Sequence, residues 1–239
     1  MKRCWLKVWL SVLCAGLAVS ASYGQELERT QAVQEFEALK SKLATLEKPL
    51  LAVSAEDTVA FAEFLKQPDS GLIRLLPREK YDARLEIRGG GAYYSFTRLK
   101  HEYGRGSDIE LSQEQFSVGF AGFNFGFLLA LGDKPLEELT VDTSELRFLL
   151  EFKPPQIEPE IRAIQMQSGR GVEANGLTYK SYLPAKAGRT YALRSVDYEN
   201  SDVLVGFRVV RQDTDGSMIL LWKMLHKFPV PKALRERGN

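Results

Sequence analysis

One short segment of the chain brings acidic, basic and hydrogen-bonding side chains together. His101, Glu102 and Tyr103 are consecutive, and Arg105 and Asp108 follow shortly afterwards. A histidine beside a carboxylate is what general acid–base catalysis and Ser-His-Asp chemistry require. The segment is also polar and contains glycine, which is typical of a solvated loop. We therefore treat it as a candidate ligand contact and predict no catalytic residue.

Two further tyrosines extend the set of candidate ligand contacts, which is Tyr93, Tyr94, His101, Glu102, Tyr103 and Asp108. Tyr93 and Tyr94 are neighbours in an expected strand, where successive side chains point to opposite faces of the sheet. At most one of them can therefore line a groove. A surface tyrosine can stack on a sugar, whereas a buried tyrosine packs in the core or across strands.

Carboxylates alone offer a rival hypothesis, a secreted hydrolase. Glycoside hydrolysis uses two carboxyl groups that flank the bond to be broken. Asp108, Glu110, Glu102 and Asp202 are available, and only the fold decides whether two of them meet. The sequence favours no particular pair.

Two motifs resemble ligand sites but have the wrong neighbours. Asp213–Ser217 resembles part of a calcium loop, yet an EF-hand in that register would place Arg211 and Trp222 at ligand positions. Gly89–Gly91 lacks the following helix that a phosphate-binding loop requires. The chain has no His-x-x-x-His pair and no Gly-x-Ser-x-Gly elbow. We therefore predict no metal site and no cofactor.

The N-terminus has the pattern of a cleavable signal peptide over residues 1–24. Basic residues near the start precede an apolar run, Val8–Val19, and small residues follow. Cleavage is expected after Ala21 or after Gly24. The apolar run is too short to span a bilayer comfortably, so a membrane anchor is the less favoured interpretation. The sequence thus predicts a secreted or periplasmic protein.

Cleavage there changes the charge and the cysteine content. The full chain has 239 residues, of which 44% are hydrophobic and 26% charged, and its net charge is +1. Residues 1–24 hold three of the 32 basic residues, none of the 31 acidic residues and both cysteines, so the mature net charge is −2. Such a chain shows no electrostatic signature of nucleic-acid binding and forms no disulfide. A packed core must therefore stabilise it.

The segment 25–68 is predicted to be helical. Within Glu26–Lys48 one apolar stripe recurs at alternating spacings of four and three residues: Ala32, Phe36, Leu39, Leu43 and Leu46. The stripe suits a helix packed on the β-rich domain or a short coiled coil that makes a homo-oligomer. Pro49 is expected to end this helix. Ser54 and Asp57 resemble a capping box that starts a second helix, Ala55–Lys66.

Residues 69–230 favour β-strands, and 231–239 is predicted to be a flexible tail because of its prolines. The expected strands include Arg84–Arg88, Ala92–Leu99, Asp108–Leu111, Leu146–Phe152, Thr178–Tyr182, Thr190–Val196, Val203–Arg211 and Met218–Phe228, while Gln156–Gly176 shows no strong period. In Phe116–Leu131 the apolar positions change parity at Ala121-Gly122, which predicts a bulge or turn between two buried strands. Ser117–Gly132 contains no charged residue, but membrane contact is less favoured than burial in the core.

A pattern that recurs within the sequence suggests an internal duplication of one segment. Gly71–Leu111 and Gly176–Leu221 share glycine, proline, aromatic and Gly-Ser positions at an offset of 105 to 111 residues. The match predicts two β-meanders, 70–131 and 175–228, and common turn chemistry is the alternative explanation. The strongest local signal is the hairpin Ser201–Phe228 with its turn at Asp213–Gly216. The predicted fold is mainly β, α+β overall: an antiparallel β-sandwich or partly closed barrel preceded by two helices.

Together these features favour a non-catalytic extracytoplasmic protein. It would bind a small apolar or glycan-like ligand or serve in an envelope assembly. The rivals are the carboxylate-dependent hydrolase and a structural homo-oligomer held by Glu26–Lys48.

Overall fold

The computed structural model describes the backbone of residues 4–120 and 122–234, and the side chains from residue 26 onward except residue 27. Two compact units follow each other along the chain, one up to Leu46 and one from Glu47 onward. Residues 1–3 of the expected signal peptide and residues 235–239 of the expected tail lie outside the described residues.

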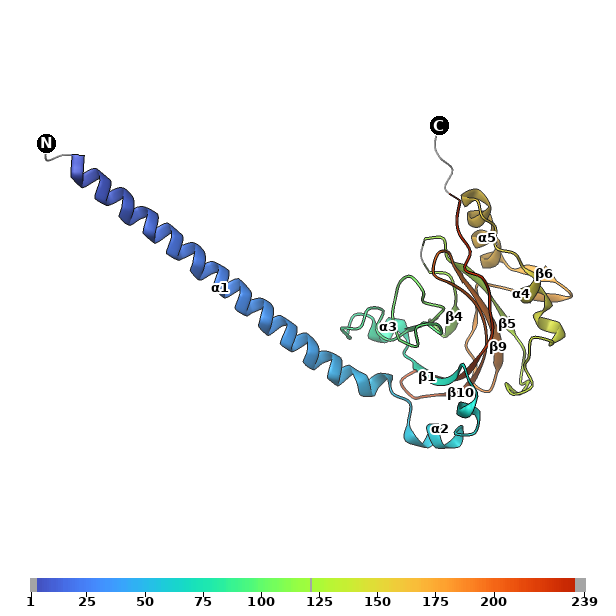
Figure 1. Cartoon of the computed structure of the whole chain (residues 1–239). Coiled ribbons are helices and arrows are strands. Elements are labelled where there is room, and N and C mark those ends of the chain that lie inside the picture. Colours follow the sequence, from blue (N-terminus) through green and yellow to red (C-terminus); the bar gives the residue numbers. More distant parts are fainter. Residues whose placement is uncertain (1–3, 121, 235–239) are drawn as a thin grey trace. The chain divides into compact units, whose positions relative to one another are not determined.

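The first unit is helical and belongs to α1, Cys4–Leu51 (Figure 1). This helix contains the expected helix Glu26–Lys48, but it continues two residues beyond Pro49. Pro49 lies in the last turn, where its missing N–H removes only one backbone hydrogen bond. Among the described residues, no helix combines the length and the hydropathy needed to cross a membrane.

The second unit contains all other described elements. Its helices are α2 (Ala55–Ala60), η1 (Phe64–Lys66), α3 (Arg78–Tyr81), η2 (Ser144–Leu146), α4 (Arg147–Glu151) and α5 (Glu158–Arg170). Its strands are β1 (Ser70–Leu75), β2 (Tyr93–Tyr94), β3 (Ile109–Ser112), β4 (Gln115–Ser117), β5 (Phe125–Ala130), β6 (Val172–Ala174), β7 (Leu177–Tyr179), β8 (Tyr182–Pro184), β9 (Thr190–Asp197), β10 (Ser201–Gln212) and β11 (Met218–Lys227).

A five-stranded antiparallel sheet in the order β1-β11-β10-β9-β5 forms the centre of this unit (Figure 1). The predicted hairpin Ser201–Phe228 is confirmed as β10 and β11. In its turn, the Asp213 N–H donates to the Ser217 carbonyl, and Gly216 takes a φ of +88°. Glycine adopts a positive φ at the least cost, which explains its place in this turn.

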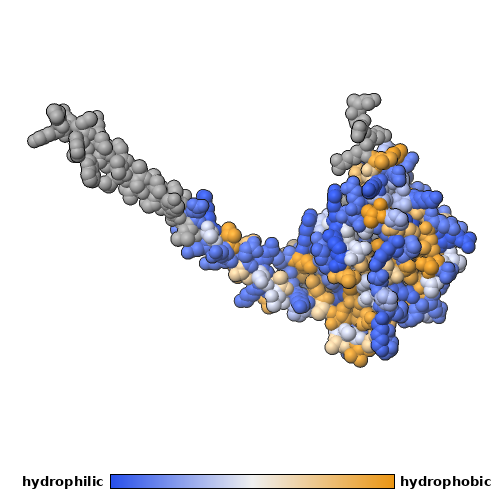
Figure 2. Space-filling view, in the orientation of Figure 1, coloured by the Kyte–Doolittle hydropathy of each residue, from blue (hydrophilic) through white to orange (hydrophobic). Residues whose placement is uncertain are grey.

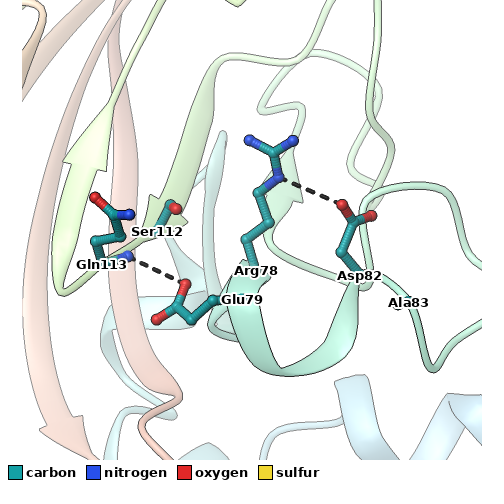
Figure 3. Close-up of a pocket in the computed structure, with 6 residues that line it drawn as sticks. All are labelled: Arg78, Glu79, Asp82, Ala83, Ser112 and Gln113. Atoms are coloured by element: carbon teal, nitrogen blue, oxygen red, sulfur yellow. Dashed lines mark hydrogen bonds and ion pairs between the residues drawn. The ribbon is translucent and has the colours of Figure 1, made fainter.

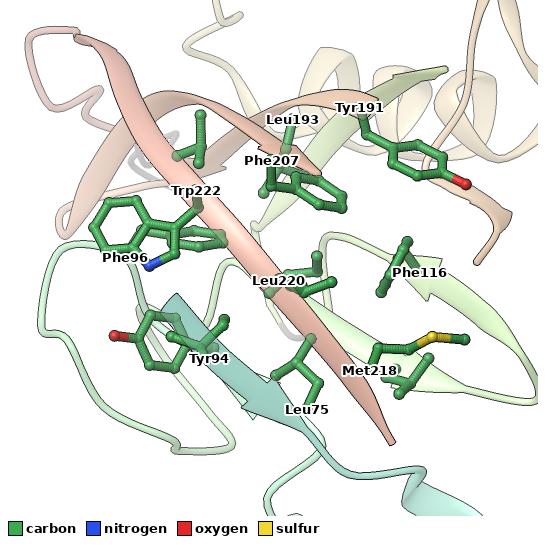
Figure 4. Close-up of a cluster of buried hydrophobic side chains, with 14 of the residues drawn as sticks. Leu75, Tyr94, Phe96, Phe116, Tyr191, Leu193, Phe207, Met218, Leu220 and Trp222 are labelled. Carbon is green, nitrogen blue, oxygen red and sulfur yellow. The ribbon is translucent and has the colours of Figure 1, made fainter. Parts of the chain in front are cut away.

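Both faces of the five-stranded sheet are buried. On one face its side chains meet those of the smaller sheet in an aromatic-rich cluster, whose labelled members in Figure 4 include Tyr94, Phe116, Phe207 and Trp222. On the other face a second cluster packs against α4 and α5. A strand that is buried on both faces needs apolar residues at successive positions, which explains the unbroken run Met218–Trp222.

The smaller sheet has four antiparallel strands in the order β2-β3-β4-β8. The break between two strands that the parity change predicts within Phe116–Leu131 is confirmed. Strand β4 ends at Ser117, β5 begins at Phe125, and the two strands join different sheets. Gly119 and Gly122 take positive φ values in the connection between them. A third, two-stranded sheet pairs β6 with β7.

Two predicted strands are wrong. Leu146–Phe152 contains the end of η2 and all of α4, because Leu146 and Leu149 are its fully buried residues and a spacing of three suits one face of a helix. Arg84–Arg88 lies in turns that follow α3. The N–H groups of Glu86 and Ile87 in this segment donate to the carboxylate of Glu47 instead of to a neighbouring strand.

Other boundaries also differ from expectation. Only two residues of the expected strand Ala92–Leu99 form β2, and the aperiodic Gln156–Gly176 contains the thirteen-residue helix α5. At the start of the expected tail, the Glu199 N–H donates to the Pro231 carbonyl at 2.9 Å, and the Leu234 N–H donates to a carbonyl before α5 at 2.7 Å. Backbone hydrogen bonds therefore hold residues 231–234.

A buried arginine joins the central sheet to α4. Arg194 on β9 forms a two-pronged ion pair with Asp202 on β10, at 2.9 and 2.8 Å, and both side chains are almost fully buried. The same guanidinium donates to the backbone carbonyls of Leu149 and Phe152. A second two-pronged pair, Arg211 with Asp57, ties β10 to α2.

The protein is thus a mixed α+β chain with mostly antiparallel sheets. Its described residues form no closed barrel, since β1 and β5 are the two edges of the central sheet. The segments 70–131 and 175–228 differ in their order of elements, because the first contains α3 and turns where the second contains β9. The repeat therefore gains no support from the structure.

Candidate functional site

A row of polar and aromatic side chains crosses the four-stranded sheet. In the strand register, Tyr93 of β2 faces Glu110 of β3, and Glu110 faces Ser117 of β4. Ser117 in turn faces Tyr182 of β8. Residues directly opposite each other on neighbouring strands share one face of a sheet. We call these four residues the outer row.

The outer row lies on the face of the sheet that points away from the core. The residues that adjoin it along β2, β3 and β4 are buried in the cluster between the two sheets: Tyr94, Ile109, Leu111 and Phe116. Because successive side chains of a strand alternate between faces, the outer row must point the other way. Of the two adjacent tyrosines, Tyr94 belongs to the core cluster and Tyr93 lines a cavity on the outer face.

Glu110 is the centre of the hydrogen bonds in the outer row. Its Oε1 accepts from the Tyr93 hydroxyl at 2.5 Å and from Arg78 Nη1 at 3.1 Å. Its Oε2 accepts from the Ser117 hydroxyl at 2.8 Å. These bonds compensate for the burial of Glu110, which is only 8% exposed. Burial and the bond to Glu110 both raise the pKa of Tyr93, so its phenol stays protonated and acts as a donor.

Aromatic side chains enclose one end of the row. Tyr103 and Phe120 each pack edge-to-face on Tyr93, with ring centroids 4.8 and 5.2 Å away. A cavity of about 280 Å³ lies among these rings, Glu110 and Arg78. The residues that line the cavity also include Tyr182, which is 45% exposed. The lining of the cavity therefore combines aromatic side chains with hydrogen-bonding ones.

Arg78 also lines a second, open hollow of about 520 Å³ on the surface (Figure 3). There Arg78 Nε lies 3.4 Å from Asp82, and the Gln113 N–H donates to Glu79 at 3.1 Å. Arg78 is the first residue of α3, and the preceding Pro77 has the fixed φ that suits a helix start. Its guanidinium thus stands at the border of two polar hollows.

The candidate residues Tyr94 and His101 lie elsewhere. His101 Nε2 is 2.7 Å from the Arg74 carbonyl, and its ring packs edge-to-face on Tyr94. Burial lowers the pKa of His101 and raises the pKa of Tyr94 to about 12. Both side chains thus contribute to packing, and the histidine has no carboxylate among its described hydrogen-bond partners.

The other carboxylates considered for hydrolysis each bind a different partner within the protein. Glu102 pairs with Lys100 at 2.7 Å, and this contact lowers the pKa of Glu102. Asp108 is fully buried and accepts the Phe96 N–H at 2.8 Å. Asp202 is bound by Arg194. Of the four carboxylates, only Glu110 lines the described cavity.

The structure therefore brings together two of the six candidate residues, Tyr93 and Tyr103, and leaves the other four outside the cavity. Sequence reasoning did not identify the residues that complete the site: Arg78, Ser117, Phe120 and Tyr182. The only available signal was the alternation of polar and apolar residues in β3 and β4. It shows which residues face outward, but it does not show which strands are neighbours.

Within the described ranges, no group of three histidine, cysteine or acidic side chains is arranged to hold a metal ion. The hairpin turn that resembles a calcium loop is instead cross-linked by Asp215, which accepts from Arg74 at 3.0 Å and from Tyr81 at 2.8 Å. Comparisons with protein-family models, with curated proteins and with solved structures yield no match to this chain.

Proposed function

We propose that the protein is a non-catalytic binding protein whose outer-row cavity takes a glycan-like ligand. The observation that carries this proposal is the outer row Tyr93–Glu110–Ser117–Tyr182, which brings hydrogen-bonding and aromatic side chains together in the lining of one cavity. Sugars present hydroxyl groups at their edges and apolar C–H faces, so such a mixed lining suits them.

The chemistry of the polar residues that line the cavity favours recognition over reaction. A guanidinium carries five N–H donors, and Arg78 uses two of its nitrogens on Glu110 and Asp82, so donors remain for ligand oxygens. Glu110 has both oxygens engaged and orients its neighbours. A glycosidase would need a second carboxylate across the bond, and Glu110 is the only carboxylate that lines this cavity among the described residues.

An apolar ligand is less suited to this molecule. The space between the two sheets is occupied by the protein's own aromatic and aliphatic side chains (Figure 4). The open cavity on the outer face carries charged and hydroxyl groups instead. We therefore propose a glycan-like ligand and not an apolar one.

We also propose an architecture for the second unit and a location for the protein. The shared core of the two larger sheets supports a β-sandwich as the architecture of the second unit. The basic start and apolar run of residues 1–24 support secretion or a periplasmic location. N-terminal sequencing of protein from the extracytoplasmic fraction tests the location, and a retained residue 1 contradicts it.

A screen on an immobilised oligosaccharide panel, followed by titration calorimetry on each hit, tests the binding function. We expect Tyr182→Ala to weaken binding about tenfold, which corresponds to about 1.4 kcal/mol for the loss of one stacking face. Met166→Ala is the matched control, because Met166 is an exposed apolar residue on α5 outside the cavity. A panel without hits, or a Tyr182→Ala variant that binds like the unmodified protein, refutes the proposal.

Native mass spectrometry of protein isolated from its own envelope fraction gives a second test. A retained carbohydrate supports the proposal. A stoichiometric protein partner without carbohydrate supports a role in an envelope assembly instead.

A further inference from the structure

The part of α1 whose side chains are described carries an exposed apolar face. Phe36, Leu39, Leu43 and Leu46 are each between 45% and 62% exposed. Figure 2 shows apolar side chains at the surface of this part of α1, beside charged ones. A line of exposed large apolar side chains on one face of a helix is typical of an interaction surface.

The spacing of this face is that of a coiled coil. Phe36 and Leu43 occupy position a of a heptad, and Ala32, Leu39 and Leu46 occupy position d. We propose that this face is the seam of a parallel two-stranded coiled coil formed by two copies of the chain. Each apolar side chain of one copy then packs among four residues of the other copy, as knobs-into-holes packing requires.

The charges beside the seam favour a second copy in parallel orientation. In this register Glu35 is at position g and Lys40 at the following position e, and both are exposed. These two positions lie opposite each other across a parallel seam, so the dimer contains the Glu35–Lys40 pair twice. An antiparallel dimer with its centre near residue 41 would instead bring Lys40 and Lys42 of both copies together, and like charges repel.

The seam spans only about two heptads in the described side chains, so we expect a dissociation constant in the micromolar range. In a parallel dimer, the two second units are attached at the same end of the coiled coil. Each dimer then carries two outer-row cavities. Two weak sites on one molecule bind a repetitive surface more tightly than one site does.

Sedimentation equilibrium of the full chain, with the mass of the purified product measured first, tests the dimer. The unmodified protein should dimerise reversibly. Leu39→Asp should raise the dissociation constant by at least about 100-fold, because it places two carboxylates in an apolar seam. Ser41→Asp is the matched control, because Ser41 is at position f, on the outside, and its dissociation constant should change less than threefold.

Disulfide cross-linking tests the orientation. In a background with Cys4→Ser and Cys14→Ser, Leu39→Cys should form a covalent dimer on mild oxidation, because the two position-39 side chains meet across a parallel seam. Ser41→Cys, on the outer side, should not cross-link. An antiparallel dimer would cross-link only when Leu39→Cys is mixed with Leu43→Cys.

The proposal is overturned if the unmodified chain is monomeric up to about 200 μM, well above a micromolar dissociation constant. It is also overturned if Leu39→Asp dimerises normally, or if Leu39→Cys cross-links only to Leu43→Cys. A monomer that captures another protein or lipid vesicles would show that this face has a different partner. Oligosaccharide binding by Leu39→Asp reports on the outer-row cavity independently, so failure of one proposal does not imply failure of the other.

Discussion

Replacing Asp108 with asparagine should change the stability of the protein more favourably at neutral and alkaline pH than at acidic pH. Asp108 is fully buried just before β3, where its carboxylate accepts the Phe96 N–H at 2.8 Å. Burial raises the pKa of Asp108 from 3.8 to about 7, and the nearby carboxylate of Asp197 adds to this effect. The Ser195 hydroxyl, the hydrogen bond from the Phe96 N–H and the charge of Arg98 oppose the rise in the pKa of Asp108 without cancelling it.

The sign of the effect follows from the direction of this shift. A carboxyl group whose pKa is higher in the folded state binds its proton more tightly there than in the unfolded state. Its contribution to stability is therefore complete below pH 4 and disappears as the pH rises through about 7. A difference of about three pKa units corresponds to roughly 4 kcal/mol of unfolding free energy between these limits. Asparagine keeps an oxygen for the Phe96 N–H and has no proton to lose.

Urea denaturation of both proteins at pH values from 4 to 9 measures this contribution. The difference in unfolding free energy, Asp108→Asn minus the unmodified protein, should rise by about 4 kcal/mol from acidic to alkaline pH. All other titrating groups are common to both proteins, so the difference isolates Asp108. The asparagine amide adds donors in a buried place, which shifts the difference by a constant. A difference that is flat with pH, or that falls, refutes the reasoning.

Three further substitutions test other contacts. Asp202→Ala should destabilise the fold by about 3–5 kcal/mol in chemical denaturation, because it leaves the Arg194 guanidinium buried without its counter-charge; replacing both residues by apolar ones of similar size should cost less. Asp57→Asn should behave oppositely to the change at Asp108: the ion pair with Arg211 lowers the pKa of Asp57, so the loss should be about 1–3 kcal/mol near pH 7 and should shrink as the pH falls below 4. Gly71→Ala should cost about 1–3 kcal/mol and change the tryptophan fluorescence, because the new Cβ would lie 2.6 Å from the Trp222 indole nitrogen.

The strongest periodic signals in the sequence predicted the central strands well. β9, β10 and β11 lie close to their expected limits, because runs of β-branched and aromatic residues end there in turn residues. The parity change in Phe116–Leu131 also located a real break between two strands. These features depend on neighbouring residues in the chain, and such local preferences are visible in a sequence.

The two wrong strand predictions lie where contacts with distant parts of the chain determine the local structure. Leu146–Phe152 alternates like a strand, yet Leu146 and Leu149 fill the core and the segment folds as a helix. The strand expected at Arg84–Arg88 is replaced by turns whose N–H groups bind the carboxylate of Glu47, more than thirty residues away in the sequence. A sequence shows the alternation but not the distant acceptor, so local pattern alone favoured the wrong element in both places.

The candidate site was only partly predictable for a related reason. In the central sheet, strands buried on both faces have few positions for polar groups. In the four-stranded sheet only one face joins the apolar cluster between the sheets, so the residue types of β3 alternate: Ile109 and Leu111 point to that cluster, and Glu110 points to the other face. That alternation marks the small sheet as the place where charged and hydroxyl groups can gather without disturbing the core. Which of them meet depends on the register that sets Tyr93 and Ser117 on either side of Glu110, and this register is fixed by long-range pairing and by turns. The cluster at His101 was conspicuous because its residues are adjacent in the sequence, whereas the outer row is assembled from four separate strands.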